Sequence, residues 1–357
     1  MKVIRDAIHG DIILDDFAVR LVDTPEFQRL RRITQLSFSY LAYPSARHTR
    51  FEHSIGTYSI AQKIYENNRD TVEGIVVYAA LLHDLGHYPF SHVLEIIYGN
   101  HEENTRQIIK KGEIGDVIGE NYSLNEFLRL LKHPVVSGDI DADRMDYLMR
   151  DAYYTGVAHG LIDLDRLIRN LHYDGEKLIV KQKGIIAAES LLVARSTMYP
   201  IVYQHHVSRI AASMLVKAVE IEGIPKGEIA RMDEIDLVAR LRGSEHSEVR
   251  ELMKAIDDRK LYKRVLYTNT PLENPSELKK ALEEEFGHLT LFDYPRYPKF
   301  EESQTYVEFS GEIKRLNEVS PLVRSLVELK DKYWKWGVYA RRDKVEEVGA
   351  FLERLIF

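Results

Sequence analysis

The sequence predicts a mainly α-helical protein that carries a smaller α+β lobe towards its C-terminal end. Apolar residues recur at helical spacing from residue 25 to about residue 220, and only one short strand pair interrupts them. Past Gly223-Ile224-Pro225, β-like runs alternate with helical ones, which is typical of an α+β unit. The chain has 357 residues, enough for about two domains. We therefore expect one domain at residues 1–222 and a lobe at residues 223–357, a candidate region for oligomerisation or regulation, with the boundary between about 222 and 260.

The N-terminal residues are expected to form a small hairpin or an extended arm. Residues 1–15 alternate around Ile8-His9-Gly10-Asp11, as strands joined by a turn do. Thr24-Pro25-Glu26 then predicts the start of a helix, because it supplies an N-cap hydroxyl, a proline at the first position and an acid in the first turn. Further along, Asp174-Gly175 predicts the turn of the one strand pair, at residues 172–180.

Helical patterns follow one another through the first unit. They cover residues 25–34, 53–68, 70–84, 91–98, 101–111, 124–132, 142–152, 162–171 and 185–221. Pro200 is expected to kink or break the last of these helices, since proline lacks the backbone donor that a helix needs. The C-terminal lobe is predicted to contain helices at 232–241, 246–256, 275–286, 320–331 and 343–356, and strands at 262–268, 289–294, 304–310 and 334–341.

The composition excludes several kinds of site. Acidic residues outnumber basic ones by 56 to 49, giving a formal net charge of -7, whereas a protein that coats nucleic acid normally has the opposite balance. A local basic pocket for a single nucleotide is still compatible with this charge. The chain contains no cysteine, so a disulfide framework, a thiol nucleophile and a cysteine-ligated metal are excluded. Any transition metal would therefore be bound by histidines and carboxylates.

No membrane or secretory segment is expected. The N-terminal stretch MKVIRDAIHGDIILDD lacks the apolar run of a signal peptide. The longest wholly apolar stretch of note, residues 75–82, is far shorter than the roughly 20 residues that span a bilayer. We therefore expect a cytoplasmic protein.

The chemically unusual residues lie in four short segments, at 47–53, 81–92, 101–103 and 139–147. In the second segment a wholly apolar helix delivers His83 and Asp84 side by side, and Gly86 is placed to end that helix. Adjacent side chains on a helix point about 100° apart, so both can reach a single ion. The alternative is a helix end with a dipole-compensating histidine and a solvated aspartate. Three more histidines within the next 20 residues favour the ion site.

The fourth segment places Asp139, Asp141 and Asp143 at a spacing that a calcium loop would use. An EF-hand would then need glycine at 144 and an acid at 150, but both positions are arginine, so that interpretation fails. A helix that begins near Asp141 and carries one carboxylate inward fits better, with the other acids capping it or pairing with the two arginines. An N-cap cluster without a ligand remains the alternative.

Taken in order, His53, His83-Asp84 and Asp143 follow the H…HD…D pattern of the HD-domain metal-dependent phosphohydrolases. The sequence most closely resembles the dNTP triphosphohydrolases of that family, which include the mammalian enzyme with SAM and HD domains and bacterial dGTPase-like proteins. The stretches that carry the resemblance are 2–4, 8–10, 23–31, 50–56, 83–87, 89–92, 140–147 and 203–205. It is strong over residues 1 to about 215 and weak beyond, and it implies an HD-domain helical bundle.

The resemblance implies a role for each matching residue. The metal ligands would be His53, His83, Asp84 and Asp143. Their divalent ion (Mn, Fe, Zn, Ni or Co) would activate a water and polarise the α-phosphate, and Mg would accompany the substrate triphosphate. Proton transfer would involve His87 and His101, with Glu95 or Glu102 orienting His101. The substrate would be held by Gln35, Leu36, Arg50, His92, Arg144, Tyr147, Asp151, Arg195 and Tyr203.

Within that set, Arg50 and Arg195 would clamp the triphosphate, while Asp151 would hold the 3′-hydroxyl. Tyr147 would leave no room for a 2′-hydroxyl, and Tyr203 would stack near the base. The family reaction yields a deoxynucleoside and inorganic triphosphate. Three positions depart from the family pattern, because Arg144 and His206 stand where relatives have lysine and Glu95 where some have aspartate.

A second nucleotide site is also implied. Its residues would be Lys2, Val3, Asp23, Gln28 and Arg31, which match positions that bind an activating guanine nucleotide between subunits in regulated relatives. We therefore expect a homodimer or homotetramer that responds to GTP or dGTP. The alternative for these residues is a capped helix with a solvated face.

Other functions stay open at this point. The chain could hydrolyse another nucleotide or phosphate ester, or it could be a non-catalytic nucleotide sensor or single-stranded nucleic-acid-binding module that keeps a metal for structure. The remaining histidines are interpreted as surface or packing residues: His9, His133, His159, His172, His246 and His288.

Overall fold

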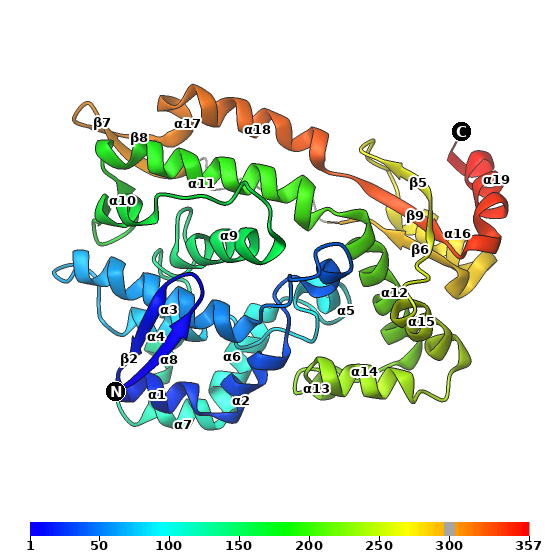
Figure 1. Ribbon diagram of the computed structural model, residues 1–357, viewed down its shortest axis with the longest axis horizontal. Helices are drawn as coiled ribbons and strands as arrows, with labels where there is room; N and C mark the ends of the chain where they lie inside the picture. Colours follow the sequence, from blue (N-terminus) through cyan, green and yellow to red (C-terminus); the bar gives the residue numbers. More distant parts are fainter. Residues whose placement is uncertain (296–303, 357) are drawn as a thin grey trace.

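Helices make up most of the structure, and a smaller part built on sheets lies towards the C-terminal end, so the predicted fold class is confirmed (Figure 1). The computed structural model describes residues 1–295 and 304–356. The helices of the first part are α1 Asp16–Val22, α2 Pro25–Gln28, α3 Arg50–Asn67, α4 Val76–Leu82, α5 Glu95–Tyr98, α6 His101–Lys111, α7 Glu113–Gly119, α8 Leu124–Leu130, α9 Ala142–Thr155, α10 Leu164–Arg169, α11 Ile185–Met198 and α12 His206–Glu222. Those that follow are α13 Lys226–Ile229, α14 Glu234–Arg242, α15 Ser247–Asp257, α16 Pro275–Phe286, α17 Leu316–Val319, α18 Pro321–Tyr333 and α19 Val345–Ile356.

Three small sheets complete the described part of the chain. The strands are β1 Lys2–Asp6, β2 Gly10–Leu14, β3 Leu171–Tyr173, β4 Leu178–Val180, β5 Lys263–Thr268, β6 Thr290–Asp293, β7 Tyr306–Phe309, β8 Glu312–Arg315 and β9 Trp336–Ala340. The strands β1 and β2 form an antiparallel hairpin, as the alternation of residues 1–15 predicts. The order in the other two sheets is β3-β4-β7-β8 and β5-β9-β6.

Most predicted elements are present, and the differences have local causes. The long helix predicted at 185–221 is broken by a π-helical turn, Tyr199–Tyr203, which contains Pro200 as expected. The helix predicted at 70–84 begins only at Val76, because residues 68–74 form turns around Asn68, whose side chain donates to the carbonyl of Ile64. The helix predicted at 25–34 is one α-helical turn followed by a 3₁₀ turn, Arg29–Arg32. Helices α1 and α7 were not anticipated.

The two parts of the chain share a core. Strand β4 pairs in parallel with β7, so a segment from beyond residue 300 extends a sheet that begins near residue 171. Val307, Leu316 and Val323 join the main apolar core with residues of α3, α4 and α9. The division at residue 222 stays a prediction, and the structure adds that the chain returns to the first part after it.

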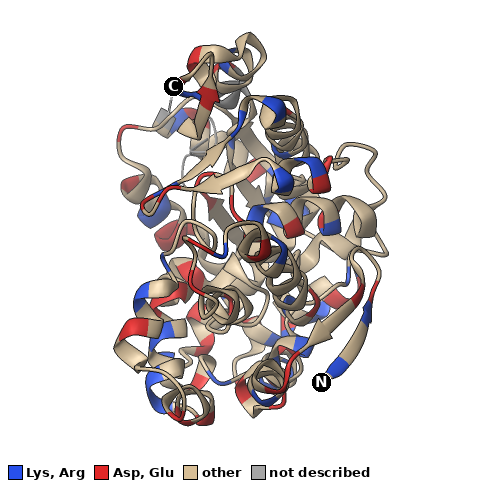
Figure 2. Ribbon diagram, turned by 90° about the vertical axis from the view of Figure 1, so that its left-hand side faces the viewer, with Lys and Arg blue, Asp and Glu red and all other residues tan. Residues whose placement is uncertain are grey.

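Acidic and basic residues alternate over the same helices and strands in the view of Figure 2, which agrees with the net charge of -7. One segment, Gln182–Tyr203, is apolar and long enough for a membrane span by length and composition, with a mean hydropathy of 1.3. Part of it, 44%, is buried inside the protein. Core helices of water-soluble proteins can have the same length and hydropathy, so this one segment is weak evidence for a membrane span.

Helix α3 crosses α9 so closely that the crossing point has to be a glycine. A Cβ atom on Gly56 would overlap the carboxylate of Asp146 and the guanidinium of Arg150, both on α9. These two side chains are themselves fully buried and paired with each other, with Arg150 Nε 2.8 Å from Asp146 Oδ2. The spacing of the two helices is therefore fixed where α3 presents its inner face.

We predict that Gly56→Ala destabilises the protein, although alanine is the better helix former by about 1 kcal/mol. Overpacking at a filled crossing typically costs about 1–3 kcal/mol, and displacing a buried ion pair adds to that cost. The measurement is urea unfolding followed by circular dichroism. Gly119→Ala is the matched control, since a Cβ on Gly119 meets nothing within 4 Å. Equal stability of the two variants would contradict the close crossing.

Candidate metal centre and active site

Three helix ends bring the four predicted metal ligands together. Helix α3 starts with a capping box between Thr49 and Glu52 and places His53 at the end of its first turn. The apolar helix α4 ends at His83, so that His83 and Asp84 emerge from the core at one point. Helix α9 is capped by Asp141, whose side chain accepts from the Arg144 backbone, and it carries Asp143 in its first turn. The predicted helix start at Asp141 is thereby confirmed.

The ligand atoms converge within the distances that one ion requires. His53 Nε2 lies 3.0 Å from Asp143 Oδ1 and 3.5 Å from Asp84 Oδ2. His83 Nε2 lies 3.2 Å from Asp84 Oδ1 and 3.6 Å from Asp143 Oδ1. Two imidazoles and two carboxylates around one point form a donor set that suits Mn, Fe, Zn, Ni or Co.

Both imidazoles are oriented as ligands. The Nδ1 atom of His53 donates to Asp146 Oδ2 at 2.8 Å, and that of His83 donates to the Ala80 carbonyl at 2.8 Å. Each Nδ1 is therefore used as a hydrogen-bond donor, which leaves each Nε2 as the ring atom that could bind a metal. The Nε2 atoms of both residues are buried and lack a hydrogen bond. Buried polar atoms rarely stay unsatisfied, so the residues present fit a divalent cation.

The local charge also favours a cation. Burial lowers the pKa of His53, but the nearby carboxylates of Asp143 and Asp146 outweigh it and raise that pKa to about 10. Burial raises the pKa of Asp84, but the charges of His83 and Arg50 hold it well below its usual range. The field of these carboxylates stabilises positive charge on the histidines, and it would stabilise a metal ion in the same place.

Further buried residues contact this set, and no motif in the sequence predicts their contacts. The buried Asp146 carboxylate accepts from His53, from Arg150 and from His9, whose Nε2 lies 2.6 Å from Asp146 Oδ1. The His9 side chain is only 2% exposed and is buried beside the candidate metal site. The sequence predicts only a surface or packing role for this histidine. Asp6 from the same hairpin pairs with Arg150 at 2.8 Å. The signals were weak: Asp146 is one turn from Asp143, and His9 lies in the turn between β1 and β2.

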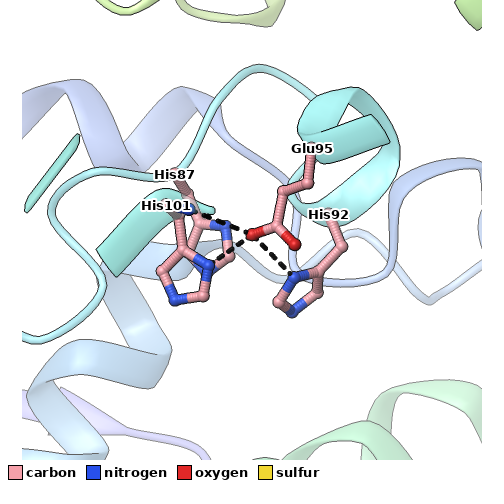
Figure 3. A group of neighbouring side chains, drawn as sticks. All are labelled: His87, His92, Glu95 and His101. Atoms are coloured by element: carbon pink, nitrogen blue, oxygen red, sulfur yellow. Dashed lines mark hydrogen bonds and ion pairs between the residues drawn. The ribbon is translucent and has the colours of Figure 1, made fainter. Parts of the chain in front are cut away.

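A second group of ionisable side chains adjoins the first. Figure 3 shows the carboxylate of Glu95 between His92 and His101, with His87 beside His101. Glu95 Oε1 bonds His101 Nδ1 through a short contact and lies 3.2 Å from His92 Nδ1. The rings of His87 and His101 stack with centroids 3.8 Å apart. Thus Glu95 contacts His101, while Glu102 is exposed at the rim of the pocket.

Charge balance differs between these residues. Burial raises the pKa of Glu95, but hydrogen bonds from His101 and His92 outweigh it and lower that pKa. Burial, with the nearby charge of Arg50, holds the pKa of His87 well below its usual range, so His87 is neutral at pH 7. His87 Nε2 lies 3.2 Å from Asp84 Oδ1, which places the two groups side by side.

One cavity of about 610 Å³ connects nearly all of these residues. The predicted site residues that line it are Gln35, Leu36, Arg50, His83, Asp84, His87, His92, His101, Glu102, Asp143, Arg144, Tyr147, Asp151, Arg195 and Tyr203. His53 lies behind the wall, fully buried, and Glu95 lines an adjoining cavity. A volume of this size is that of a small-molecule site.

Hydrogen bonds fix the polar groups of the wall. Arg195 Nη1 donates to Tyr147 Oη at 2.7 Å, so residues of α11 and α9 meet across the cavity. Asp151 accepts from Tyr203 Oη at 2.8 Å and from His48 Nε2 at 2.8 Å. His48 was within a segment singled out by the sequence but had no assigned role, and it positions Asp151.

None of the five residues of the predicted second nucleotide site lines this cavity. Lys2 Nζ is 3.4 Å from Asp23 Oδ1, and Gln28 Oε1 accepts from Arg31 Nε at 2.8 Å. Val3 is 58% exposed on β1, and the Arg31 guanidinium lies 3.4 Å from the centre of the Phe51 ring. Four of the five residues thus form two polar pairs, and the second nucleotide site stays a prediction.

Comparisons with known proteins agree with this geometry. The HD domain family model matches residues 50–151, and the model of the HD associated region matches residues 162–356. An uncharacterised protein of Methanocaldococcus jannaschii is 42% identical, covering 98% of this chain and 81% of that protein. The human deoxynucleoside triphosphate triphosphohydrolase SAMHD1 is 28% identical over 82% of this chain, which spans 55% of the human protein.

A solved structure agrees as well. The crystal structure of a phosphohydrolase from Bacteroides thetaiotaomicron has a TM-score of 0.78 and 26% identity, covering 96% of this chain and 100% of that one. The matched HD domain begins at Arg50, the first residue of α3, and contains all four predicted metal ligands. The chain therefore belongs to the HD-domain family of metal-dependent phosphohydrolases, in which the HD domain is followed by an HD-associated region.

Proposed function

We propose that the protein hydrolyses deoxynucleoside triphosphates to a deoxynucleoside and inorganic triphosphate. The observation that supports this best is the pairing of the His/Asp metal set with three arginines in one cavity, Arg50, Arg144 and Arg195. A phosphate monoester needs fewer cations than this, whereas a triphosphate carries enough charge to use all three. The similarity to SAMHD1 supports the same substrate class.

The reaction requires water to form a bond to the α-phosphorus while the bond from that phosphorus to the 5′-oxygen breaks. A divalent ion bound by His53, His83, Asp84 and Asp143 would activate the water and polarise the phosphate. Arg50 would hold phosphate oxygens, since its guanidinium is fixed by Ser91 Oγ at 2.9 Å and by Asp84 at 2.5 Å. A pre-oriented guanidinium loses little entropy when it binds phosphate.

The departing 5′-oxygen has to receive a proton. His101 is proposed to supply it, because Glu95 holds its Nδ1 and leaves Nε2 directed to the side of Asp84, 3.8 Å from Asp84 Oδ1. This pair resembles the arrangement in which a carboxylate orients a catalytic imidazole. The neutral His87 would donate its ring N–H to an oxygen of the same phosphate.

The sugar is proposed to lie between Tyr147 and Asp151. Asp151 would accept from the 3′-hydroxyl, and the Tyr147 ring, held by Arg195, would occupy the space that a 2′-hydroxyl needs. The base would then lie towards Tyr203, whose hydroxyl is tied to Asp151.

Loss of a metal ligand is expected to remove both metal and turnover. The purified protein would be offered each dNTP with Mn²⁺ or Mg²⁺, and inorganic triphosphate would be separated from pyrophosphate and phosphate. We expect triphosphate from the wild type and at least a ~1000-fold loss in His53→Ala and Asp143→Ala, with metal content by mass spectrometry falling in parallel. His172→Ala, an exposed histidine on β3, is the control. Pyrophosphate or phosphate as product would keep the phosphohydrolase and reject the substrate, and retained metal without turnover would indicate a nucleotide sensor.

Discrimination against ribonucleotides is expected to depend on Tyr147. Replacing Tyr147 by alanine opens the space beside the 2′-carbon, so the ratio of kcat/KM for dGTP to that for GTP should fall at least about tenfold. Tyr153→Ala provides the comparison, because Tyr153 is on the same helix and is 61% exposed. An unchanged ratio in Tyr147→Ala would show that another residue excludes the 2′-hydroxyl.

Regulation by guanine nucleotide is part of the proposal. GTP or dGTP would bind between subunits at the face formed by Lys2, Val3, Asp23, Gln28 and Arg31 and would favour a dimer or tetramer. We expect added GTP to raise the dNTP hydrolysis rate and the sedimentation coefficient together, and Lys2→Ala to shift both to higher GTP concentration. Lys63→Ala, which removes another exposed lysine, should leave both curves in place. A monomer whose rate is flat in GTP would refute this part alone.

A further inference from the structure

A short turn in the HD-associated region contacts residues next to those that line the candidate active site. Its three consecutive residues, Met232, Asp233 and Glu234, begin helix α14. The Met232 carbonyl accepts from Arg29 Nη1 at 2.9 Å, and the Asp233 carboxylate binds Arg32 Nε. The three residues of the turn thus bind, in the same order, Arg29, Arg32 and Thr34, which are about 200 positions earlier in the chain.

Glu234 makes the contact nearest to the site. Its Oε1 atom accepts from the backbone and the hydroxyl of Thr34, both at 2.6 Å, and from the backbone of Phe90 at 3.2 Å. The carboxylate is therefore bound by two loops, both of which contribute residues to the lining of the cavity. All three donors are neutral, and burial raises the pKa of Glu234.

The loop that Glu234 binds has an unusual backbone. Phe90 and Ser91 have φ angles of 61° and 58°, in a region that residues other than glycine rarely adopt. Such conformations persist only where the surroundings determine them, and they concentrate at functional sites. The bond from the Phe90 backbone to Glu234 is one of the contacts that determine this loop.

The same loop orients the arginine of the active site. Ser91 Oγ donates to the Thr34 carbonyl at 2.6 Å and accepts from Arg50 Nε at 2.9 Å. Arg50 in turn pairs with Asp84. Glu234 is therefore connected to Arg50 through Thr34, Phe90 and Ser91, with each link a hydrogen bond of 3.2 Å or less.

We propose that Glu234 is a positioning residue for the reaction, which holds the Phe90–Ser91 loop so that Ser91 fixes the guanidinium of Arg50. The HD-associated region then contributes to phosphate binding without touching the substrate. Arg29 strengthens the same support, since its Nη2 donates to the carbonyls of Leu85 and His87 in the catalytic loop.

The test separates positioning from stability. Glu234→Ala is compared with Glu222→Ala, which removes another carboxylate that secures α14, through Arg240 Nε at 2.7 Å and through Ser244. We expect Glu234→Ala to raise KM about tenfold with metal content unchanged, and Glu234→Gln to restore most of the affinity because its amide oxygen still accepts from Thr34. Glu222→Ala should lower stability without changing kcat or KM.

A double-mutant cycle with Ser91→Ala tests the connection itself. If Glu234 acts through Ser91, the kcat/KM of the double variant is no lower than that of the more impaired single variant. If the two residues act independently, the losses in kcat/KM multiply. These kinetics rest on the proposed function, so hydrogen exchange provides a readout that needs no substrate. Amide exchange in residues 86–94 should be faster in Glu234→Ala than in the wild type and unchanged in Glu222→Ala.

The outcomes distinguish the two proposals. Wild-type protein that does not hydrolyse dNTPs contradicts the proposed substrate, while hydrogen exchange still decides the role of Glu234. Unchanged exchange in Glu234→Ala, or multiplied losses in the cycle, overturns the inference. If Glu234→Ala does not fold, Glu234→Gln and Thr34→Val are compared in the same way, because the latter removes the hydroxyl that donates to Glu234.

Discussion

The buried carboxylate of Asp146 is the contact on which the rest of the structure depends. It accepts from His53, Arg150 and His9, and so it joins α3, α9 and the N-terminal hairpin at one point. A carboxylate without these donors would be too costly to bury. Because the bond from His53 uses Nδ1, the same contact directs Nε2 to the metal position. The helix crossing leaves room for this carboxylate only because residue 56 is glycine. The packing of α3 against α9 and the orientation of the His53 ring therefore depend on the same interaction.

The charges around this contact are balanced only in part by the protein. Asp84, Asp143 and Asp146 lie within one cluster, and Arg50 and Arg150 neutralise two of them. Burial lowers the pKa of His53, but the carboxylates of Asp143, Asp146 and Asp84 together outweigh it and raise that pKa to about 10. A divalent cation between His53 and His83 would satisfy both the charge and the two buried Nε2 atoms. These carboxylates would be costly to bury in the core without compensating positive charge, so the electrostatics of the cluster favour a bound cation.

Much of the fold and of the metal set could be predicted from the sequence, because the signals are local. The apolar run before His83 and the cap at Asp141 each specify a helix end within a few residues. The supporting residues could not be found in this way. His9 meets Asp146 across 137 positions, and Glu234 meets Thr34 across 200 positions. Neither periodicity nor motif spacing encodes such contacts, since they depend on how helices pack rather than on how each one forms. The return of β7 to β4 is another case, as a four-residue strand carries no information about its partner.

The cavity is lined by residues from outside the HD domain as well as by residues within it. The proposed metal ligands lie within residues 50–151, but Gln35 and Leu36 precede that range, and Arg195 and Tyr203 follow it in the HD-associated region. Arg195 is on α11, and Tyr203 is the last residue of the π-helical turn Tyr199–Tyr203 that joins α11 to α12. A change in that turn would reshape the end of the cavity proposed for the sugar and base while the proposed metal ligands stay in place, because none of those four residues is on α11 or α12. The residues proposed to contact the sugar and base and those proposed to bind the metal thus belong largely to different segments, and in the proposed mechanism the 232–234 turn helps to position Arg50, which contacts Asp84.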